Sequence, residues 1–304
     1  EEYQERAEVT AVKEPVGAEL TPAGTTPDTL VPWAFEQDYE FRQRLLSRLG
    51  VDEMVEKLYD LSEDYDSWER ALVGCAHLDK ERRAEEYEMV NEIVDYFGLD
   101  APALFFAPER RMIPTILGGD PVMVAITAGM INALPESGLR FSIGRTIAHL
   151  ALDDQVCRQV ATVVLQRSPT SQTDVEEALT DLLVTTTLGW DVGISRDEMA
   201  MTRKIAHAWD QRAALSADRG GLLACGDLDA ACLTIARGTA RDSDRAADLD
   251  FDDFMAPYEA QDPRQLAAID PKECPLRNGS YGAYRILMLK WWARTDQYQQ
   301  LAGA

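Results

Sequence analysis

The stretch Leu139–Leu150 has the sequence LRFSIGRTIAHL, which combines the spacing of a helix with a group of polar side chains. Its apolar residues recur every three or four positions and continue in the same rhythm beyond the stretch. This pattern predicts one helix over about 139–166. Arg145 and His149 are four positions apart and therefore share one face of that helix, and Thr146 lies next to Arg145.

Two later stretches carry motifs that go with this helix. Residues 210–231 read DQRAALSADRGGLLACGDLDAA, and residues 280–301 read SYGAYRILMLKWWARTDQYQQL. Together with Leu139–Leu150 they resemble, in order and approximate spacing, the gluzincin zinc metallopeptidases of the CAAX prenyl protease and HtpX heat-shock protease type, metallopeptidase family forty-eight. The resemblance covers about 36–301 and implies an α+β fold, in which a mostly helical metallopeptidase-like domain carries a small β-sheet beside the active-site helix.

In that family an H-E-x-x-H helix supplies two zinc ligands and the general base, and a Glu from a later helix supplies the third ligand. The resemblance places Arg145 at the first His, Thr146 at the general-base Glu, His149 at the second His and Ala214 at the third-ligand Glu. Only one of the three ligand positions therefore keeps a residue that can bind zinc.

These replacements predict that the zinc site is lost. A guanidinium stays protonated and cannot coordinate a cation, Thr has no pKa suited to taking a proton from water, and Ala has no donor atom. The chain has three His in all, so substitute ligands are scarce. We therefore expect no bound metal or other cofactor, no catalytic residue, and a pseudoenzyme instead of a working protease.

The resemblance also implies two supporting residues, Asp218 and Arg285. Asp218 lies one helical turn after Ala214, so we expect an ion pair between Arg145 and Asp218 that links the two helices in place of the metal. The alternative is that Arg145 extends its guanidinium into solvent.

The same helix leaves a choice for His149. A hydrogen-bonded core histidine is favoured over a vestigial ligand, with Asp153, one turn further on, as the group that holds the imidazole. The alternative is a weak site for a hard cation built from His149, Asp153 and Asp154.

The organisation of the chain follows from composition and periodicity. Residues 1–35, which are rich in Glu, Pro, Thr and Gly, predict an extended or loosely docked arm, and residues 36–304 predict a single domain. Within that domain we expect N-terminal helices over 36–100, a small sheet over 102–128, active-site-type helices over 139–237 and a closing helix over 282–301.

Finer signals place individual elements. The sheet is expected to have strands at 103–107, 113–117 and 122–127, with a hairpin turn at 118–120. Two capping boxes predict helix starts, one at Thr173 and Glu176 and one at Ser195 and Glu198, the second opening a helix towards 213. Asp227 is the predicted cap of a helix that runs to about Arg237, and a last helix is expected from about Gly282 to Trp292. Between these two helices we expect an acidic loop over 238–253.

Composition limits the partners and the compartment. With 53 acidic against 30 basic residues the formal net charge is −23, which disfavours nucleic acid and anionic membrane surfaces as partners. The five Cys are odd in number and contain no C-x-x-C pair, which indicates reduced thiols in a cytoplasmic protein. The longest apolar run, Val122–Leu134, is too short to span a bilayer, so we expect a soluble chain.

The favoured function is that of a catalytically inactive metallopeptidase homologue that binds a protein partner as a regulatory or scaffold protein. We expect it to take up a peptide segment along a strand edge formed by Val122, Val124 and Ile126. One alternative is a divergent zinc metalloendopeptidase that uses His149, the Asp153–Asp154 pair and another group. A second alternative is a structural subunit of a larger assembly, and the sequence does not specify the oligomeric state.

Overall fold

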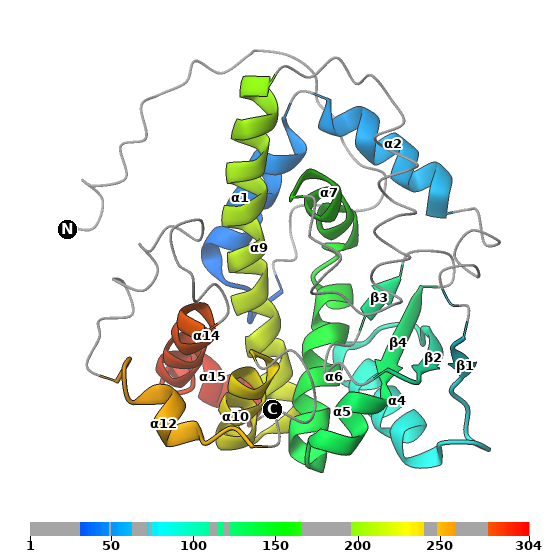
Figure 1. Cartoon of the computed structure of the whole chain (residues 1–304), viewed down its shortest axis with the longest axis vertical. Coiled ribbons are helices and arrows are strands. Elements are labelled where there is room, and N and C mark those ends of the chain that lie inside the picture. The colour runs from blue at the N-terminus through cyan, green and yellow to red at the C-terminus, as the bar shows by residue number, and fades with distance from the viewer. Residues whose placement is uncertain are drawn as a thin grey trace. The chain divides into compact units, whose positions relative to one another are not determined.

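A computed structural model of the chain describes residues 31–48, 50–62, 72, 74–109, 115–117, 122–165, 196–239, 248–259 and 279–303. Residues 31–304 cluster as one compact unit. Figure 1 shows its elements, which in chain order are α1 (Glu36–Leu46), α2 (Val51–Ser62), β1 (Ala76–His77), α4 (Ala84–Phe97), β2 (Ala103–Ala107), β3 (Thr115–Leu117), β4 (Met123–Thr127), α5 (Ala128–Ala133), α6 (Glu136–Ala151), α7 (Gln155–Leu165), α9 (Arg196–Cys225), α10 (Leu228–Gly238), α12 (Phe251–Met255), α14 (Gly279–Trp292) and α15 (Asp296–Ala302).

The strands form one small mixed sheet with the order β1-β2-β4-β3. β2 and β4 run parallel, with Ala103 opposite Met123, while β1 and β3 are antiparallel to their neighbours. The described chain is otherwise mostly helical, so the α+β class is confirmed. β1 falls in the range for which only helices were expected.

Helices cover both faces of the sheet. Val124 and Ile126 pack with residues of α4, α5 and α6 in one core cluster, whereas Met123 and Ala125 pack with residues of α1, α2, α7 and α9 in another. All five residues of β4 are buried as a result. A strand covered on both faces has a continuous apolar sequence without alternation, which is the pattern of this segment.

The predicted peptide-binding edge at Val122, Val124 and Ile126 is therefore wrong. β4 pairs with β2 on one side and with β3 on the other, so its backbone groups are already used. The carbonyl of Val122, just before the strand, accepts from the amide of Ala103 at 2.8 Å. In the described sheet the outer strands are β1 and β3.

The single helix expected over 139–166 is broken into α6 and α7. The break lies at Asp153, whose φ of 51° is in the left-handed region, so the chain turns there. The hydrogen bonds of the next helix, α7, begin where the amide of Arg158 donates to the carbonyl of Asp154 at 2.9 Å. The turn brings the start of α7 back beside the end of α6.

Two short helices, α5 and α12, were not expected, and α15 is a separate short helix where the closing helix over 282–301 was predicted to continue. Each of the three begins with a side-chain cap: Thr127, Asp250 and Thr295 accept from the backbone amide three residues further on. α12 occupies the end of the segment expected to be an acidic loop.

The remaining helix predictions are confirmed in whole or in part where the structure describes them. The predicted Asp227 cap of α10 and the helix ending at Trp292 are both confirmed. α9 begins near the predicted point but runs for 30 residues, far beyond 213. The turn at 118–120, the capping box at Thr173 and the Ser195 cap lie outside the described residues.

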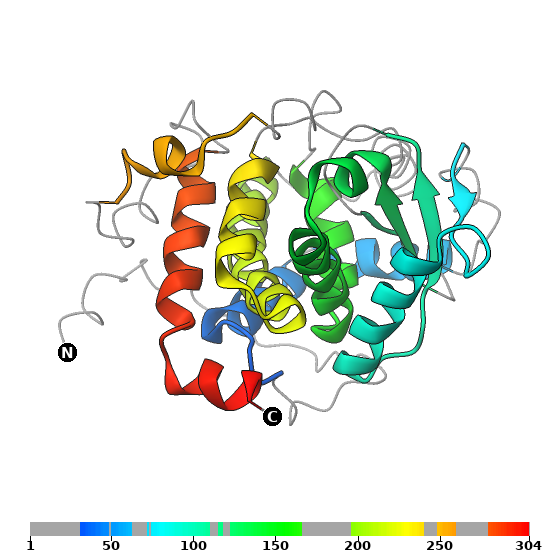
Figure 2. The same ribbon diagram turned by 90° about the horizontal axis from the view of Figure 1, so that it is seen from below.

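α6 and α9 pack against each other unusually closely. A Cβ atom added at Gly144 would lie 2.4 Å from Cβ of Ala224, and one at Gly221 would lie 2.8 Å from the carbonyl oxygen of Phe141. Glycine is required at both positions because any side chain would push the helices apart. Figure 2 shows α6 in the middle of the molecule, with α10 and α14 on one side and α4 and the sheet on the other.

Candidate functional site

α6 carries Arg145, Thr146 and His149, the polar residues singled out in the sequence, and their side chains point in different directions. Arg145 and His149 lie one turn apart, and their side chains reach towards α9 and α7 respectively. Thr146 is buried, and its hydroxyl donates to the carbonyl of Ser142 at 3.1 Å, within its own helix. The hydroxyl of Thr146 is thus used within its own helix, apart from the polar contacts of Arg145 and His149.

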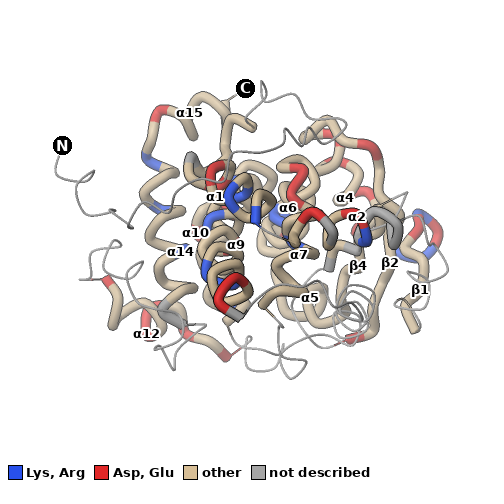
Figure 3. Tube along the Cα trace, turned by 90° about the horizontal axis from the view of Figure 1, so that it is seen from above, with Lys and Arg blue, Asp and Glu red and all other residues tan. Residues whose placement is uncertain are grey.

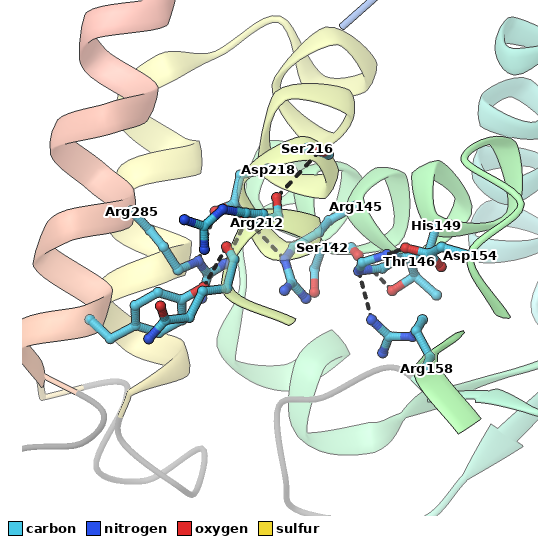
Figure 4. A network of polar contacts seen from close by, with 12 residues as sticks. Ser142, Arg145, Thr146, His149, Asp154, Arg158, Arg212, Ser216, Asp218 and Arg285 are labelled. Atoms are coloured by element: carbon cyan, nitrogen blue, oxygen red, sulfur yellow. Dashed lines mark hydrogen bonds and ion pairs between the residues drawn. The ribbon is translucent and has the colours of Figure 1, made fainter. Parts of the chain in front are cut away.

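Asp218 on α9 connects three helices. Nε of Arg145 donates to Oδ1 of Asp218 at 2.9 Å, while Arg285 on α14 donates from Nε to Oδ2 at 2.7 Å and from a terminal nitrogen to Oδ1 at 2.6 Å. Only 1% of the Asp218 side chain is exposed. The predicted ion pair between Arg145 and Asp218 is confirmed, and Arg285 completes an Arg–Asp–Arg cluster (Figure 4).

The two arginines of the cluster have pKa values that are shifted in opposite directions. Burial works against the charged form of Arg285, but Asp218 more than offsets it and raises the pKa of Arg285. Burial and then the nearby Arg285 lower the pKa of Arg145. Arg285 thus has the stronger hold on the shared carboxylate, and Arg145 is the less well compensated cation.

His149 is held by two residues of the α6–α7 turn and of α7. Its Nδ1 lies 2.7 Å from Oδ2 of Asp154, and its Nε2 lies 2.9 Å from a terminal nitrogen of Arg158. Because Arg158 can only donate, Nε2 is the acceptor and the ring proton is on Nδ1, donated to Asp154. The partner expected for the imidazole, Asp153, is wrong: its backbone turns it out of the helix, and Asp154 takes its place.

Burial shifts both groups of this pair towards their neutral forms. It lowers the pKa of His149 well below its usual value, with Arg158 and Arg145 adding to the effect. It raises the pKa of Asp154 to about 7, with Arg158 and Arg42 partly opposing the rise. Oδ1 of Asp154 is buried and has no hydrogen-bond partner, so the carboxylate is only half satisfied.

A second buried carboxyl group, Asp38 on α1, was not picked out in the sequence. The hydroxyl of Ser216 on α9 donates to Asp38 at 2.6 Å and accepts from the amide of Phe35 at 2.9 Å. Burial raises the pKa of Asp38 to about 6. Neither Asp38 nor Arg158 belongs to a sequence motif, and both are recognisable only once the helices are in place.

The side chains in this centre do not fit a catalytic zinc ion. Such an ion needs three protein ligands of N, O or S type. His149 has both ring nitrogens engaged, Arg145 carries a positive charge, and Ala214 is a buried residue with no donor atom. Within the described residues, no group of three or more His, Cys, Asp or Glu is arranged to hold a metal ion.

Comparisons of the chain with protein-family models, with curated proteins and with solved structures found no match. In the part of the chain that the structure describes, none of the helices has the length and apolar character needed to cross a bilayer.

Proposed function

We propose that this chain is a pseudoenzyme with a gluzincin-type fold, and that it acts by binding another protein without cutting it. The observation that carries the proposal is the state of His149. It is the one residue that could still bind zinc among the three positions that resemble the family's ligands, and Asp154 and Arg158 occupy both of its nitrogens.

The cluster around Asp218 supports the same conclusion. In a working enzyme of this type a metal cation would attract ligands from two helices. Here Arg145 on α6 and Arg285 on α14 provide the positive charges, and Asp218 on α9 is the carboxylate that both of them bind. Ion pairs thus connect helices that a metal ion would otherwise connect, and Thr146 stands at the position that resembles the family's general base.

Protein binding is assigned to an outer strand of the sheet. A hydrolase fold without catalytic groups keeps its surface, and a sheet edge can add an extended peptide as a further strand. Because β4 is internal, we assign this role to β3, which among the described strands pairs with β4 alone.

Metal analysis tests the loss of the zinc site. The wild-type chain, purified without chelators and then given equimolar zinc, is expected to retain far less than one zinc per molecule after desalting. Near-stoichiometric zinc that disappears in His149→Ala would contradict the proposal and favour a divergent metallopeptidase.

A gain of zinc binding tests whether Arg145, Thr146 and Ala214 stand at the positions of the family's ligands and general base. The combined variant Arg145→His, Thr146→Glu, Ala214→Glu and Arg158→Ala restores the donor set and frees Nε2 of His149, so it is expected to bind about one zinc. Arg140→His, on the same helix but on the surface beside Glu92, serves as the control and should bind none. A folded combined variant that binds no more zinc than this control would count against a gluzincin-type site.

Binding of a partner is tested by purification from the native source, followed by reconstitution from the two purified proteins. A stoichiometric complex that forms again from its components, with the partner left uncut, supports the proposal. Cleavage of the partner would contradict it.

A further inference from the structure

Arg145 and Arg158 both lie near enough to His149 to lower the pKa of its imidazole. Arg145 and His149 are one turn apart on α6, and Arg158 reaches from α7 to Nε2 of His149 at 2.9 Å. The two guanidinium groups therefore lie on either side of the α6 face that carries His149, as Figure 4 shows. Their closeness is also felt electrostatically, because Arg158 lowers the pKa of Arg145.

These two cations are incompletely paired. Arg285 uses both oxygens of Asp218, and Arg145 shares one of those oxygens through its Nε alone. The side-chain partner of Arg158 is the imidazole of His149, which is neutral. Other nitrogens of both guanidinium groups can still donate.

Part of this centre is open to solvent. The side chain of Arg145 is 26% exposed, in contrast to the 1% of Asp218. Arg158 is also only partly buried. Figure 3 shows Lys and Arg positions of α1, α6 and α9 in the middle of the view, with Asp and Glu positions among them, in a chain whose formal net charge is −23.

We propose that Arg145 and Arg158 form a binding site for a carboxylate group. A guanidinium presents its N–H groups as a flat fork that matches the two oxygens of a carboxylate, and such charge-assisted bonds are strong in a partly buried site. If the proposed function holds, on which this step rests, the carboxylate belongs to an acidic side chain or the C-terminus of the partner protein.

The charge of the surroundings favours a carboxylate over a phosphate. Asp218 binds Arg145 and Arg285, and Asp210 contributes negative potential to His149 and to Arg285. These groups offset much of the positive charge of the arginines, so the site has a small net excess that suits a monoanion better than a dianion.

Small anions test the site on the full-length chain. The melting temperature is measured with increasing acetate at constant ionic strength, with acetamide as the neutral molecule of the same shape and inorganic phosphate as the competing anion. We expect acetate to raise the melting temperature of the wild-type chain, acetamide to leave it unchanged, and phosphate to act more weakly than acetate.

Three variants locate the effect, each compared with its own melting temperature without acetate. Arg145→Gln and Arg158→Gln should each weaken the apparent affinity for acetate by about tenfold or more, because each removes charge-assisted bonds. Arg158→Gln leaves the Asp218 cluster intact, so it remains informative if Arg145→Gln folds poorly. The control Arg140→Gln, which removes a similarly exposed arginine of α6 that pairs with Glu92, should keep the full response.

An equal response to acetate in the wild type and in both site variants would overturn the proposal, as would stronger stabilisation by phosphate than by acetate. The acetate response does not depend on zinc or on proteolysis. Stoichiometric zinc in the wild-type chain would therefore refute the proposed function without removing the anion response, and loss of the response would leave the zinc result standing.

Discussion

At the scale of single residues, Asp218 is the residue on which the polar centre depends. Its carboxylate is almost fully buried and accepts from two guanidinium groups on two different helices. A buried ion pair contributes little net stability compared with apolar packing, but removing one partner leaves the other charge buried and uncompensated. Here the loss of one carboxylate would leave two partly buried guanidinium groups without their shared acceptor.

Asp218→Asn is therefore expected to lower the free energy of unfolding by about 3–5 kcal/mol. The measurement is urea denaturation at neutral pH. Asp229→Asn, the same change at an exposed position in the first turn of α10, should cost no more than about 1 kcal/mol. Equal losses in the two variants would show that the cluster adds no stability.

The two buried carboxyl groups make the stability depend on pH. Asp154 has a pKa of about 7 and Asp38 of about 6 in the folded chain, against an ordinary 3.8, with burial as the main cause. The folded state thus holds these protons more tightly than the unfolded state. The stability they contribute is complete below about pH 4 and is lost as the pH rises through the folded pKa.

His149 acts in the opposite direction. Its pKa is lowered by burial, so its neutral form contributes stability above about pH 6.5 that is lost as the pH falls. The groups that face Asp154 and set its charge also include Arg158, Arg42, Asp210 and Arg145. Substituting one group at a time separates these contributions.

We expect the free energy of unfolding of the wild type, measured from pH 4 to 8, to fall relative to that of Asp154→Asn by up to about 4 kcal/mol as the pH rises to 7. In Asp38→Asn the corresponding difference should level off about one pH unit lower, at about 6. Parallel pH profiles for the wild type and Asp154→Asn would contradict the assignment.

The sequence predicted part of this centre, and the reason is geometric. Arg145 and Asp218 could be paired in advance because each lies at a fixed offset within a helix, and the family resemblance sets those two helices face to face. Asp154 was considered only as part of a cation site with His149, and Arg158 was not considered, because their contacts with His149 depend on the left-handed turn at Asp153. An apolar period of 3.6 residues runs on through such a turn without a visible break.

At the scale of elements, the close packing of α6 on α9 brings these groups together. Gly144 and Gly221 lie where the two helices meet, and their lack of a side chain lets Arg145 of one helix reach Asp218 of the other. Small residues at a helix crossing permit a short interaxial distance. The spacing of the helices is thus as much a part of the site as its charges.

Gly221→Ala is expected to destabilise the chain by about 1–3 kcal/mol, because the added methyl group would lie 2.8 Å from a backbone oxygen that cannot move aside easily. Gly238→Ala, near the end of α10, has nothing within 4 Å of the new carbon and should be neutral or stabilising by up to about 1 kcal/mol. Thermal unfolding of both variants distinguishes crowding from a general effect of alanine, and a neutral Gly221→Ala would mean that the helices can separate freely.

The long elements were predicted from the sequence, and the short helices were not. The long apolar stretches predicted α4, α6, β2, β4 and α14, because burial imposes a period on many residues at once. The short helices α5 and α12 were missed because a few residues with one capping side chain give no period, and the break between α14 and α15 was missed for the same reason. The order of the strands, and with it the error about the edge at Val124, depends on contacts between distant segments that no local pattern records.

At the scale of the whole molecule, the segment Val31–Phe35 connects several parts of the domain. The ring of Trp33 lies 4.9 Å from that of Phe97 on α4, and the carbonyl of Pro32 accepts from Gln297 on α15. Arg219 on α9 donates to the carbonyls of Trp33 and Ala34. A few residues before α1 therefore contact helices that come from both ends of the chain.

This arrangement predicts that two shortened chains differ in stability. A chain that begins at Val31 keeps these contacts, whereas one that begins at Glu36 exposes the ring of Phe97 and leaves Arg219 without its two carbonyl acceptors. Losing an aromatic contact and several hydrogen bonds costs about 3 kcal/mol, which in a domain of this size is about 6–12 °C in melting temperature. Thermal unfolding followed by circular dichroism measures the difference. Within the chain that begins at Val31, Trp33→Ala should account for a large part of the loss, since it removes the ring and keeps the backbone. Equal melting temperatures for the two shortened chains would show that Val31–Phe35 only lies on the surface of the domain and does not hold its helices together.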